Sequence, residues 1–146
     1  MVIVGATVDR TKRLVRPALY NLARIKVLPE NFVLIGVARA EGTAETWRTE
    51  LHDTLKSFVG NAATEFDVDH IDETVWKRLA DKLIYVRGDL TKAELYDKLR
   101  SVLDEDDKTH GTNGNVIFYL AVADGLFGSI SQPVSFCVSS MTSRSV

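Results

Sequence analysis

The first residues of the chain have the side chains and spacing with the clearest chemical meaning. Residues 2–4 are apolar β-formers, Gly5 follows them, and residues 6–13 carry four charged side chains. A strand that enters a glycine turn and then a helix points main-chain amide hydrogens at a phosphate, and the helix dipole favours the anion. Val8 stands where a dinucleotide-binding turn has a further glycine. The spacing therefore leaves two interpretations open, a nucleotide site or a strand-to-helix turn that needs one residue of positive φ.

The other side chains that could bind a metal ion are scattered along the sequence. His52, His70 and His110 lie far apart in the sequence, and none belongs to a pair with ligand spacing. We therefore expect surface or loop histidines and no metal site. The acidic runs at 67–73 and 104–108 lack the alternating register and terminal glutamate of calcium loops. We interpret these runs as helix caps and solvated linkers.

Composition narrows the class of protein. The chain has 146 residues, of which 45% are hydrophobic and 26% charged, and its formal net charge is −2. This is enough material for one domain with its own core, and a slightly acidic chain is not expected to bind nucleic acid. Basic residues do gather at a predicted helix start, where they suggest a local anion site or a solvated face. They are Arg10, Lys12, Arg13 and Arg16.

Two further features bear on location. Cys137 is the only cysteine, and no short apolar segment with a cleavage signature precedes the first predicted strand, so we expect a cytoplasmic protein. No apolar run approaches the ~20 residues that span a bilayer, so we expect no membrane partner.

Strand and helix patterns alternate along the chain. Strands are expected at 2–4, 31–38, 83–86 and 115–123, with helices of apolar periodicity between them. This order predicts an α/β fold with a mostly parallel sheet of about four strands flanked by helices. Pro17 should either start the first helix or kink it.

The chain divides into a main domain and a tail. Residues 1–130 contain all the strong patterns, whereas 131–146 are rich in serine and have no helical periodicity. We expect a loosely ordered tail, with a short strand at 134–138 as the alternative.

Four segments resemble the N-terminal coenzyme domain of glucose-6-phosphate dehydrogenase. They are "VIVGATVDRTKRLVRPALYNLA", "LPENFVLIGVARAE", "LIYVRGDL" and "HGTNGNVIFYLAVADGLFGSI". The resemblance covers roughly residues 1–130 and implies a Rossmann-like fold, incomplete relative to the family, that binds NADP. The complete enzyme oxidises glucose 6-phosphate in the pentose phosphate pathway.

The resemblance also implies which residues contact the coenzyme. Those residues are Gly5, Ala6, Thr7, Asp9, Arg10, Thr11, Arg39, Leu120 and Ala121. Arg39 matches the arginine that meets the 2′-phosphate of NADP, and Leu120 and Ala121 match the segment at the nicotinamide end.

Several positions depart from the family pattern. Val8 replaces a glycine, Arg10 a leucine, Leu14 a lysine that contacts the sugar phosphate, and Asp124 a proline, while the family's catalytic histidine has no counterpart. We expect weakened NADP binding, no substrate-binding residues that can be assigned, and no oxidation of glucose 6-phosphate by these residues alone.

Three interpretations of function remain. The chain is a truncated relative of the enzyme, a module that still binds NADP, or a remnant that serves as an interaction partner. The predicted strand 115–123 would lie near an edge of the sheet, where we expect either pairing with the tail or a homodimer through the exposed edge.

Overall fold

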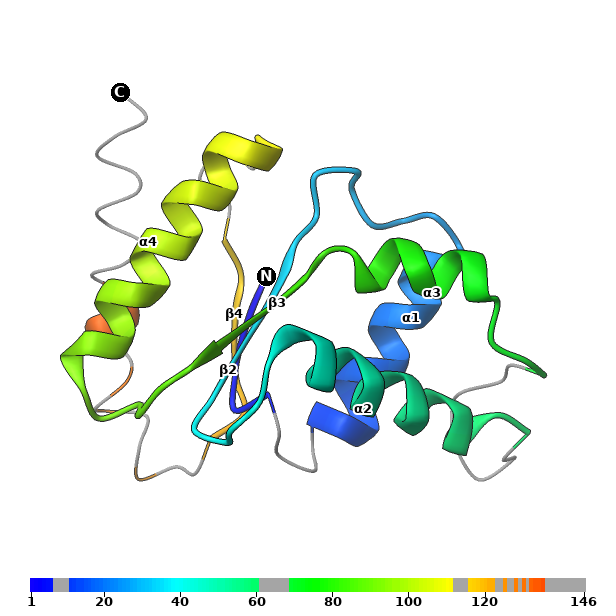
Figure 1. The fold of residues 1–146 in the computed structure, drawn as a ribbon, viewed down its shortest axis with the longest axis horizontal. Coiled ribbons are helices and arrows are strands. Elements are labelled where there is room, and N and C mark those ends of the chain that lie inside the picture. Colours follow the sequence, from blue (N-terminus) through cyan, green and yellow to red (C-terminus); the bar gives the residue numbers. More distant parts are fainter. Residues whose placement is uncertain are drawn as a thin grey trace.

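The computed structural model describes residues 1–6, 11–60, 69–111, 116–122, 125, 128, 130 and 132–135. These residues form a parallel four-stranded sheet in the order β3-β2-β1-β4, flanked by helices (Figure 1). The predicted fold class is thus confirmed. The strands are β1 (Val2–Val4), β2 (Leu34–Ala38), β3 (Leu83–Arg87) and β4 (Phe118–Leu120). The helices are α1 (Arg16–Arg24), α2 (Ala44–Phe58), α3 (Glu73–Ala80) and α4 (Ala93–His110), and a π-helical turn η1 (Thr11–Val15) precedes α1.

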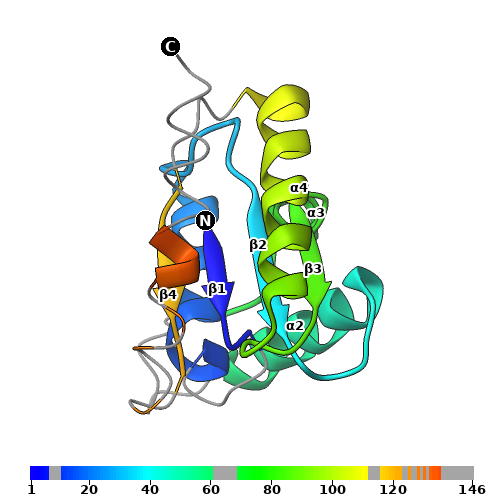
Figure 2. The ribbon, with the colours of Figure 1, turned by 90° about the vertical axis from the view of Figure 1, so that its left-hand side faces the viewer.

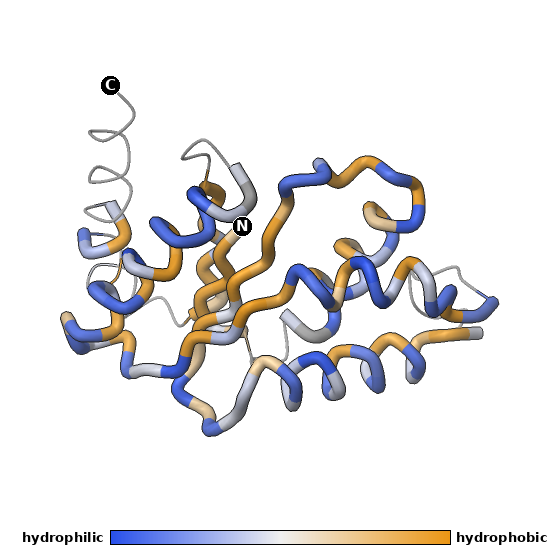
Figure 3. The backbone as a smooth tube through the Cα atoms, turned by 45° about the horizontal axis from the view of Figure 1, so that its top comes forward, coloured by the Kyte–Doolittle hydropathy of each residue, from blue (hydrophilic) through white to orange (hydrophobic). Residues whose placement is uncertain are grey.

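The helices cover both faces of the sheet. Helices α1, α2 and α3 pack on one face, and α4 packs on the other, as Figures 1 and 2 show. Side chains alternate between the two faces along each strand, so Ile3 packs on the side of α1, α2 and α3, while Val2 and Val4 pack on the side of α4. All residues of β1 and β2 are buried, which explains the near-continuous apolar runs in the sequence. The strands are accordingly the most hydrophobic part of the backbone trace (Figure 3).

Local sequence explains where the helices begin. The Thr43 hydroxyl accepts a hydrogen bond from the Thr46 amide, and the Thr43 amide donates to the Thr46 hydroxyl, which forms a capping box at α2. The Asp72 carboxylate accepts from the Thr74 amide at the start of α3. Pro17 lies in the first turn of α1, where its missing amide hydrogen costs nothing, so the prediction that it starts the helix is confirmed.

Two strands are shorter than predicted. β2 begins at Leu34 because the Phe32 amide donates to the Pro29 carbonyl and closes a turn where the sequence suggested a strand. β4 spans only 118–120, and positions 115 and 123 of the predicted strand lie outside the described residues.

Part of the predicted tail has a defined position. Residues 132–135 are helical, and Val134 is buried with Ile130 against the α4 side of the sheet (Figure 2). For the strand alternative at 134–138, the structure describes residues 134 and 135 only, and both are helical. The division at 130/131 and the loose order of the tail stay predictions.

The long helix α2 is fixed to the sheet by two contacts. The indole of Trp47 lies over Gly36 in β2, where a Cβ atom would approach the ring to 2.5 Å. The Arg48 guanidinium donates to the carbonyls of Ala80 and Leu83, at 2.8 and 3.0 Å, and so connects α2 to the end of α3 and the start of β3. None of the helices in the described residues is long and apolar enough to cross a membrane.

Candidate functional site

The carboxyl ends of all four strands meet at one edge of the sheet. β1 lies between β2 and β4, so the order of strands reverses at β1 and leaves a crevice position there. In open α/β sheets this switch point is where ligands bind. The residues that follow the strands at this edge are Gly5 and Ala6 after β1, Arg39 after β2, Gly88 and Asp89 after β3, and Ala121 after β4.

The turn after β1 requires glycine for two separate reasons. Gly5 has a φ of +88°, which residues with a Cβ atom rarely adopt. A Cβ atom at this position would also lie 2.3 Å from the carbonyl oxygen of Ala121. The Ala121 amide donates to the Val4 carbonyl at 2.8 Å, and the Gly5 amide donates to the Val37 carbonyl at 2.8 Å. The turn is therefore pressed between the ends of β2 and β4.

Two buried side chains donate hydrogen bonds to the main-chain oxygens of the turn. The Thr11 hydroxyl, which is fully buried, donates to the Gly5 carbonyl at 3.1 Å. The guanidinium of Arg16, only 1% exposed, donates to the Ala6 carbonyl at 3.2 Å and to the Thr54 hydroxyl at 3.2 Å. The main-chain oxygens of the turn thus point inward to protein donors.

Arg16 is a buried cation without a full set of partners. Its Nε atom is buried and has no hydrogen-bond partner within the part of the chain that the structure describes. Burial lowers the pKa of the Arg16 guanidinium, and the negative charge of Glu50 partly offsets this effect. Arginine nevertheless stays protonated at neutral pH. A positive charge therefore lies in the protein interior next to the turn.

The burial of Arg16 corrects one alternative from the sequence. A solvated face for the basic cluster is wrong for this residue, whereas Arg13 is exposed. The cluster was visible in the sequence, but its inward member was not. No local signal marks it, because its hydrogen-bond partners Thr54 and Ala6 lie 38 and 10 positions away in the sequence.

The ends of β2 and β3 carry a second charged group of residues. The Arg87 guanidinium lies 3.1 Å from a Glu41 carboxylate oxygen and donates from Nε to the Arg39 carbonyl at 3.5 Å. The Tyr85 hydroxyl donates to the Ala40 carbonyl at 2.7 Å. These contacts fix the main chain of the loop after β2, while the Arg39 side chain is exposed.

Asp89 lies near Arg39 at the same edge. The Thr91 amide and hydroxyl donate to one Asp89 oxygen at 2.9 and 2.7 Å. These two hydrogen bonds, and then the positive charges of Arg39 and Lys92, lower the pKa of the Asp89 carboxyl group. Asp89 is therefore ionised at neutral pH and orders the loop that follows β3.

The predicted coenzyme residues divide into two groups. The structure brings Gly5, Ala6, Thr11, Arg39 and Ala121 to the carboxyl edge or directly beneath it, with the half-buried Leu120 in the last position of β4. Predictions that concern other positions lie outside the described residues. Those positions are Thr7, Val8, Asp9, Arg10 and Asp124, and the side chain of Leu14 in η1 is also not described.

The described histidines have structural surroundings. His52 Nε2 lies 3.1 Å from a Glu73 carboxylate oxygen, and its ring lies against that of Trp76 in a tilted arrangement with the ring centres 5.0 Å apart, so it joins α2 to α3. His70 is exposed. In the described ranges, no three or more His, Cys, Asp or Glu side chains come together as a metal site.

The structure has a parallel sheet, a glycine turn after its first strand at the switch point, and a buried cation beneath that turn. This arrangement defines a Rossmann-like dinucleotide-binding domain. Comparison with known proteins gives the family. The family model "Glucose-6-phosphate dehydrogenase, NAD binding domain" matches residues 2–144, and the chain belongs to this family.

Relatives and solved structures agree with this assignment. The chain is 38% identical over 130 residues to glucose-6-phosphate 1-dehydrogenase of Chlamydia muridarum and 35% identical over 132 residues to that of Chlamydia pneumoniae. These alignments cover 89% and 90% of this chain and 24% of each relative. The crystal structure of the Mycobacterium avium enzyme matches 93% of this chain and 26% of its own, with 27% identity and a TM-score of 0.75. The chain thus spans about a quarter of the length of these relatives.

The residues present fit a dinucleotide. The Gly5 turn leaves β1 with a positive φ, a buried guanidinium lies under the turn, and an exposed arginine follows β2. The exposed Arg39 would hold a phosphate, the buried charge of Arg16 would favour an anion at the turn, and a bound nicotinamide dinucleotide would supply hydride transfer.

Proposed function

We propose that these residues bind NADP at the carboxyl edge of the sheet and form the coenzyme part of a glucose-6-phosphate dehydrogenase. The Gly5 turn at the switch point carries this proposal, because its positive φ turns the chain out of β1 at the place where a dinucleotide-binding domain holds its pyrophosphate. Thr11 and Arg16 support the turn, and Leu120 and Ala121 are proposed at the nicotinamide end. Thr7, Asp9 and Arg10 belong to the same proposal on sequence grounds.

Arg39 is proposed to select NADP over NAD. Its side chain is exposed at the end of β2, and the main chain at 39–41 is held by Arg87 and Tyr85. A guanidinium can bind a 2′-phosphate by two parallel hydrogen bonds, whereas the ribose hydroxyl of NAD cannot accept such a pair.

Oxidation of glucose 6-phosphate is proposed for the family's whole protein and not for these residues alone. One matching solved structure, at 25% identity and a TM-score of 0.76, is named as glucose-6-phosphate dehydrogenase in complex with its substrate glucose-6-phosphate. This chain matches 26% of that protein. A place in the cytoplasm and in the pentose phosphate pathway belongs to the proposal and rests on the sequence and the family.

We predict that calorimetric titration detects NADP binding and finds NAD binding weaker. The substitution Val8→Gly should raise NADP affinity, since removal of a steric or backbone obstruction is worth about 1–3 kcal/mol, or roughly 5- to 150-fold. Arg39→Ala added to that variant should abolish the preference for NADP over NAD.

The control for charge is Lys98→Ala, an exposed cation on α4 that should leave both affinities unchanged. The proposal fails if neither the parent nor the Val8→Gly variant binds NADP while both stay folded. It loses its assignment of Arg39 if the double variant still prefers NADP.

A homodimer is a second proposal, favoured by the edge of the sheet. β4 is an outer strand of the described sheet, and Ile117 directly before it is 70% exposed. Beside it lies a hollow of about 470 Å³ with mainly apolar walls that include Leu19 and Leu22. An open strand edge next to exposed apolar surface favours self-association.

We predict a concentration-dependent dimer in light scattering. Ile117→Lys should shift the molecule to monomer, whereas Ile25→Lys, which changes another exposed isoleucine that does not line the hollow, should not. A monomer at every accessible concentration of the parent chain would refute this interface.

A further inference from the structure

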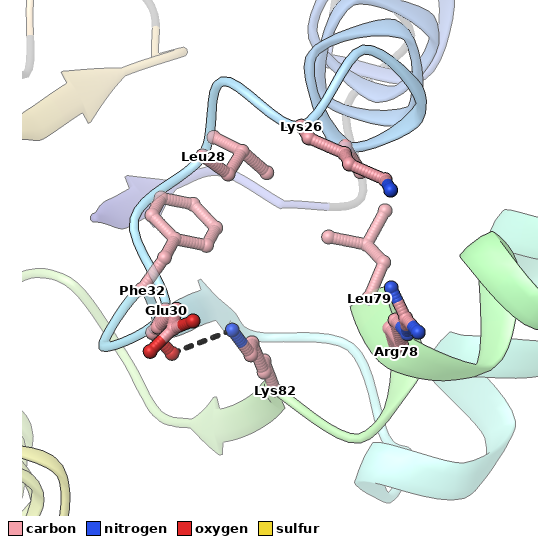
Figure 4. A pocket seen from close by; sticks show the side chains of 8 residues that line it. Lys26, Leu28, Glu30, Phe32, Arg78, Leu79 and Lys82 are labelled. Atoms are coloured by element: carbon pink, nitrogen blue, oxygen red, sulfur yellow. Dashed lines mark hydrogen bonds between the residues drawn. The ribbon is translucent and has the colours of Figure 1, made fainter.

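A second hollow lies at the amino-terminal edge of the sheet, opposite the coenzyme edge, and shares Leu28 and Phe32 with the hollow beside Ile117. The loop between α1 and β2, the end of α3 and the start of β3 enclose a volume of about 270 Å³ (Figure 4). Leu28, Phe32 and the buried Leu79 form its apolar walls. None of the proposed coenzyme residues lines this hollow, since those residues follow the strands and these precede them.

Three cations surround the apolar walls. Lys26 comes from the end of α1, Arg78 from α3, and Lys82 from the residue before β3. Figure 4 shows the Lys26 and Arg78 side chains ending on the same side of the hollow, next to Leu79. Lys82 Nζ donates to the main-chain oxygen of Glu30 at 2.7 Å, so it is held at the rim.

Lys26 and Arg78 have no anionic partner here. Across the described residues, neither side chain makes a hydrogen bond or an ion pair. The one acidic residue of the lining is the exposed Glu30, which offsets a single charge of three. The hollow therefore keeps an excess of positive charge beside an apolar surface.

The backbone at Lys26 gives an independent observation. Its φ is +59°, and it is the only non-glycine residue of positive φ among those described. Its amide donates to the Ala23 carbonyl and the Val27 amide donates to the Leu22 carbonyl, both at 3.1 Å. This is a helix end where glycine is the usual residue. A lysine is thus held in a strained conformation that directs an ammonium group toward the hollow.

Helix ends explain part of this arrangement. Lysine and arginine near the last turns of α1 and α3 interact favourably with the free carbonyls and the helix dipoles. That effect accounts for basic residue types. It does not explain why a lysine occupies a position of positive φ that glycine could fill without strain. It also does not explain the apolar walls between the cations.

We propose that this hollow binds a small organic anion, a carboxylate on an aromatic or short aliphatic body. A volume of about 270 Å³ suits a small molecule and not a peptide helix. The apolar body packs on Leu28, Phe32 and Leu79. The carboxylate pairs with Lys26 and with the fork of Arg78.

The test is an NMR titration of the folded chain with benzoate, and with benzamide as the uncharged match. Benzoate should shift the amide signals of Leu28, Phe32 and Leu79 saturably, with a dissociation constant on the order of 0.1–1 mM, and benzamide should bind at least about tenfold more weakly. Saturating NADP should leave benzoate binding unchanged, because the coenzyme edge lies at the other end of the strands. This result is independent of whether NADP itself binds.

One variant separates ligand binding from a role in the helix end. Lys26→Gly removes the ammonium group and relieves the positive φ, so it should raise the melting temperature while it weakens benzoate about tenfold or more. Arg78→Gln should weaken benzoate to a similar degree, and the α4 surface variant Lys98→Gln should not. Equal binding of benzoate and benzamide, full affinity in Lys26→Gly, or no shift at these residues would overturn the proposal.

Discussion

Replacing Gly5 by alanine is expected to cost about 2–5 kcal/mol of folding free energy, the sum of a backbone cost and a packing cost. The positive φ of +88° accounts for about 1–2 kcal/mol of this. The new Cβ atom would lie 2.3 Å from the Ala121 carbonyl oxygen, and overpacking of this kind costs about 1–3 kcal/mol. Ala121 cannot move aside freely, since its amide is bonded to Val4. Urea unfolding followed by circular dichroism measures the loss.

Gly111→Ala is the matched control. Gly111 also has a positive φ, +67°, but nothing lies within 4 Å of the position of its Cβ atom. The Gly111→Ala variant should lose only about 1–2 kcal/mol of folding free energy, the conformational part of the cost. Equal losses at positions 5 and 111 would show that the turn after β1 is not pressed against β4.

The difference between these two glycines shows what the sequence can predict. A run of β-formers followed by a glycine is a local signal, so β1 and the turn were predictable from residues 2–5. The alternation of patterns and the resemblance of four segments predicted a parallel, Rossmann-like sheet. That the glycine faces Ala121 depends on β4 pairing with β1 across more than a hundred residues, which no local signal records.

Other features depended on tertiary contacts. Residues 31–33 are partly apolar and extend the strand pattern, yet the Pro29–Phe32 turn starts β2 later. The grouping of Arg87 and Glu41 follows from the register that pairs Ala38 with Arg87. The cations at the amino-terminal edge come from separate helices and were not identified as a group. Burial of Arg16 depends on Thr54, which α2 supplies from 38 positions away.

Arg16 should therefore show a large effect that separates stability from coenzyme binding. Arg16→Ala removes the guanidinium and leaves a cavity, and we expect a loss of about 2–4 kcal/mol. Arg16→Met fills most of the same volume and carries no charge. Since apolar replacement of a buried charge is often neutral or stabilising, it should stay within about 1 kcal/mol of the parent. Thermal and urea unfolding measure both.

The Arg16→Met variant should keep the stability of the parent but not its affinity for the coenzyme. Arg16→Met abolishes the charge-assisted hydrogen bond to the Ala6 carbonyl and removes the buried positive charge beside the proposed phosphate site. Two opposite charges about 6–16 Å apart interact by about 1–3 kcal/mol at an effective dielectric constant of about 20, so NADP affinity should fall by roughly 5- to 150-fold. Calorimetric titration with NADP measures this fall, with Arg16→Met introduced into the parent chain or into the Val8→Gly variant, whichever binds NADP more tightly. If Arg16→Met keeps full affinity, the guanidinium only fills space under the turn. If it is instead as unstable as Arg16→Ala, its hydrogen bonds are needed for folding, and the turn could not keep its shape without them.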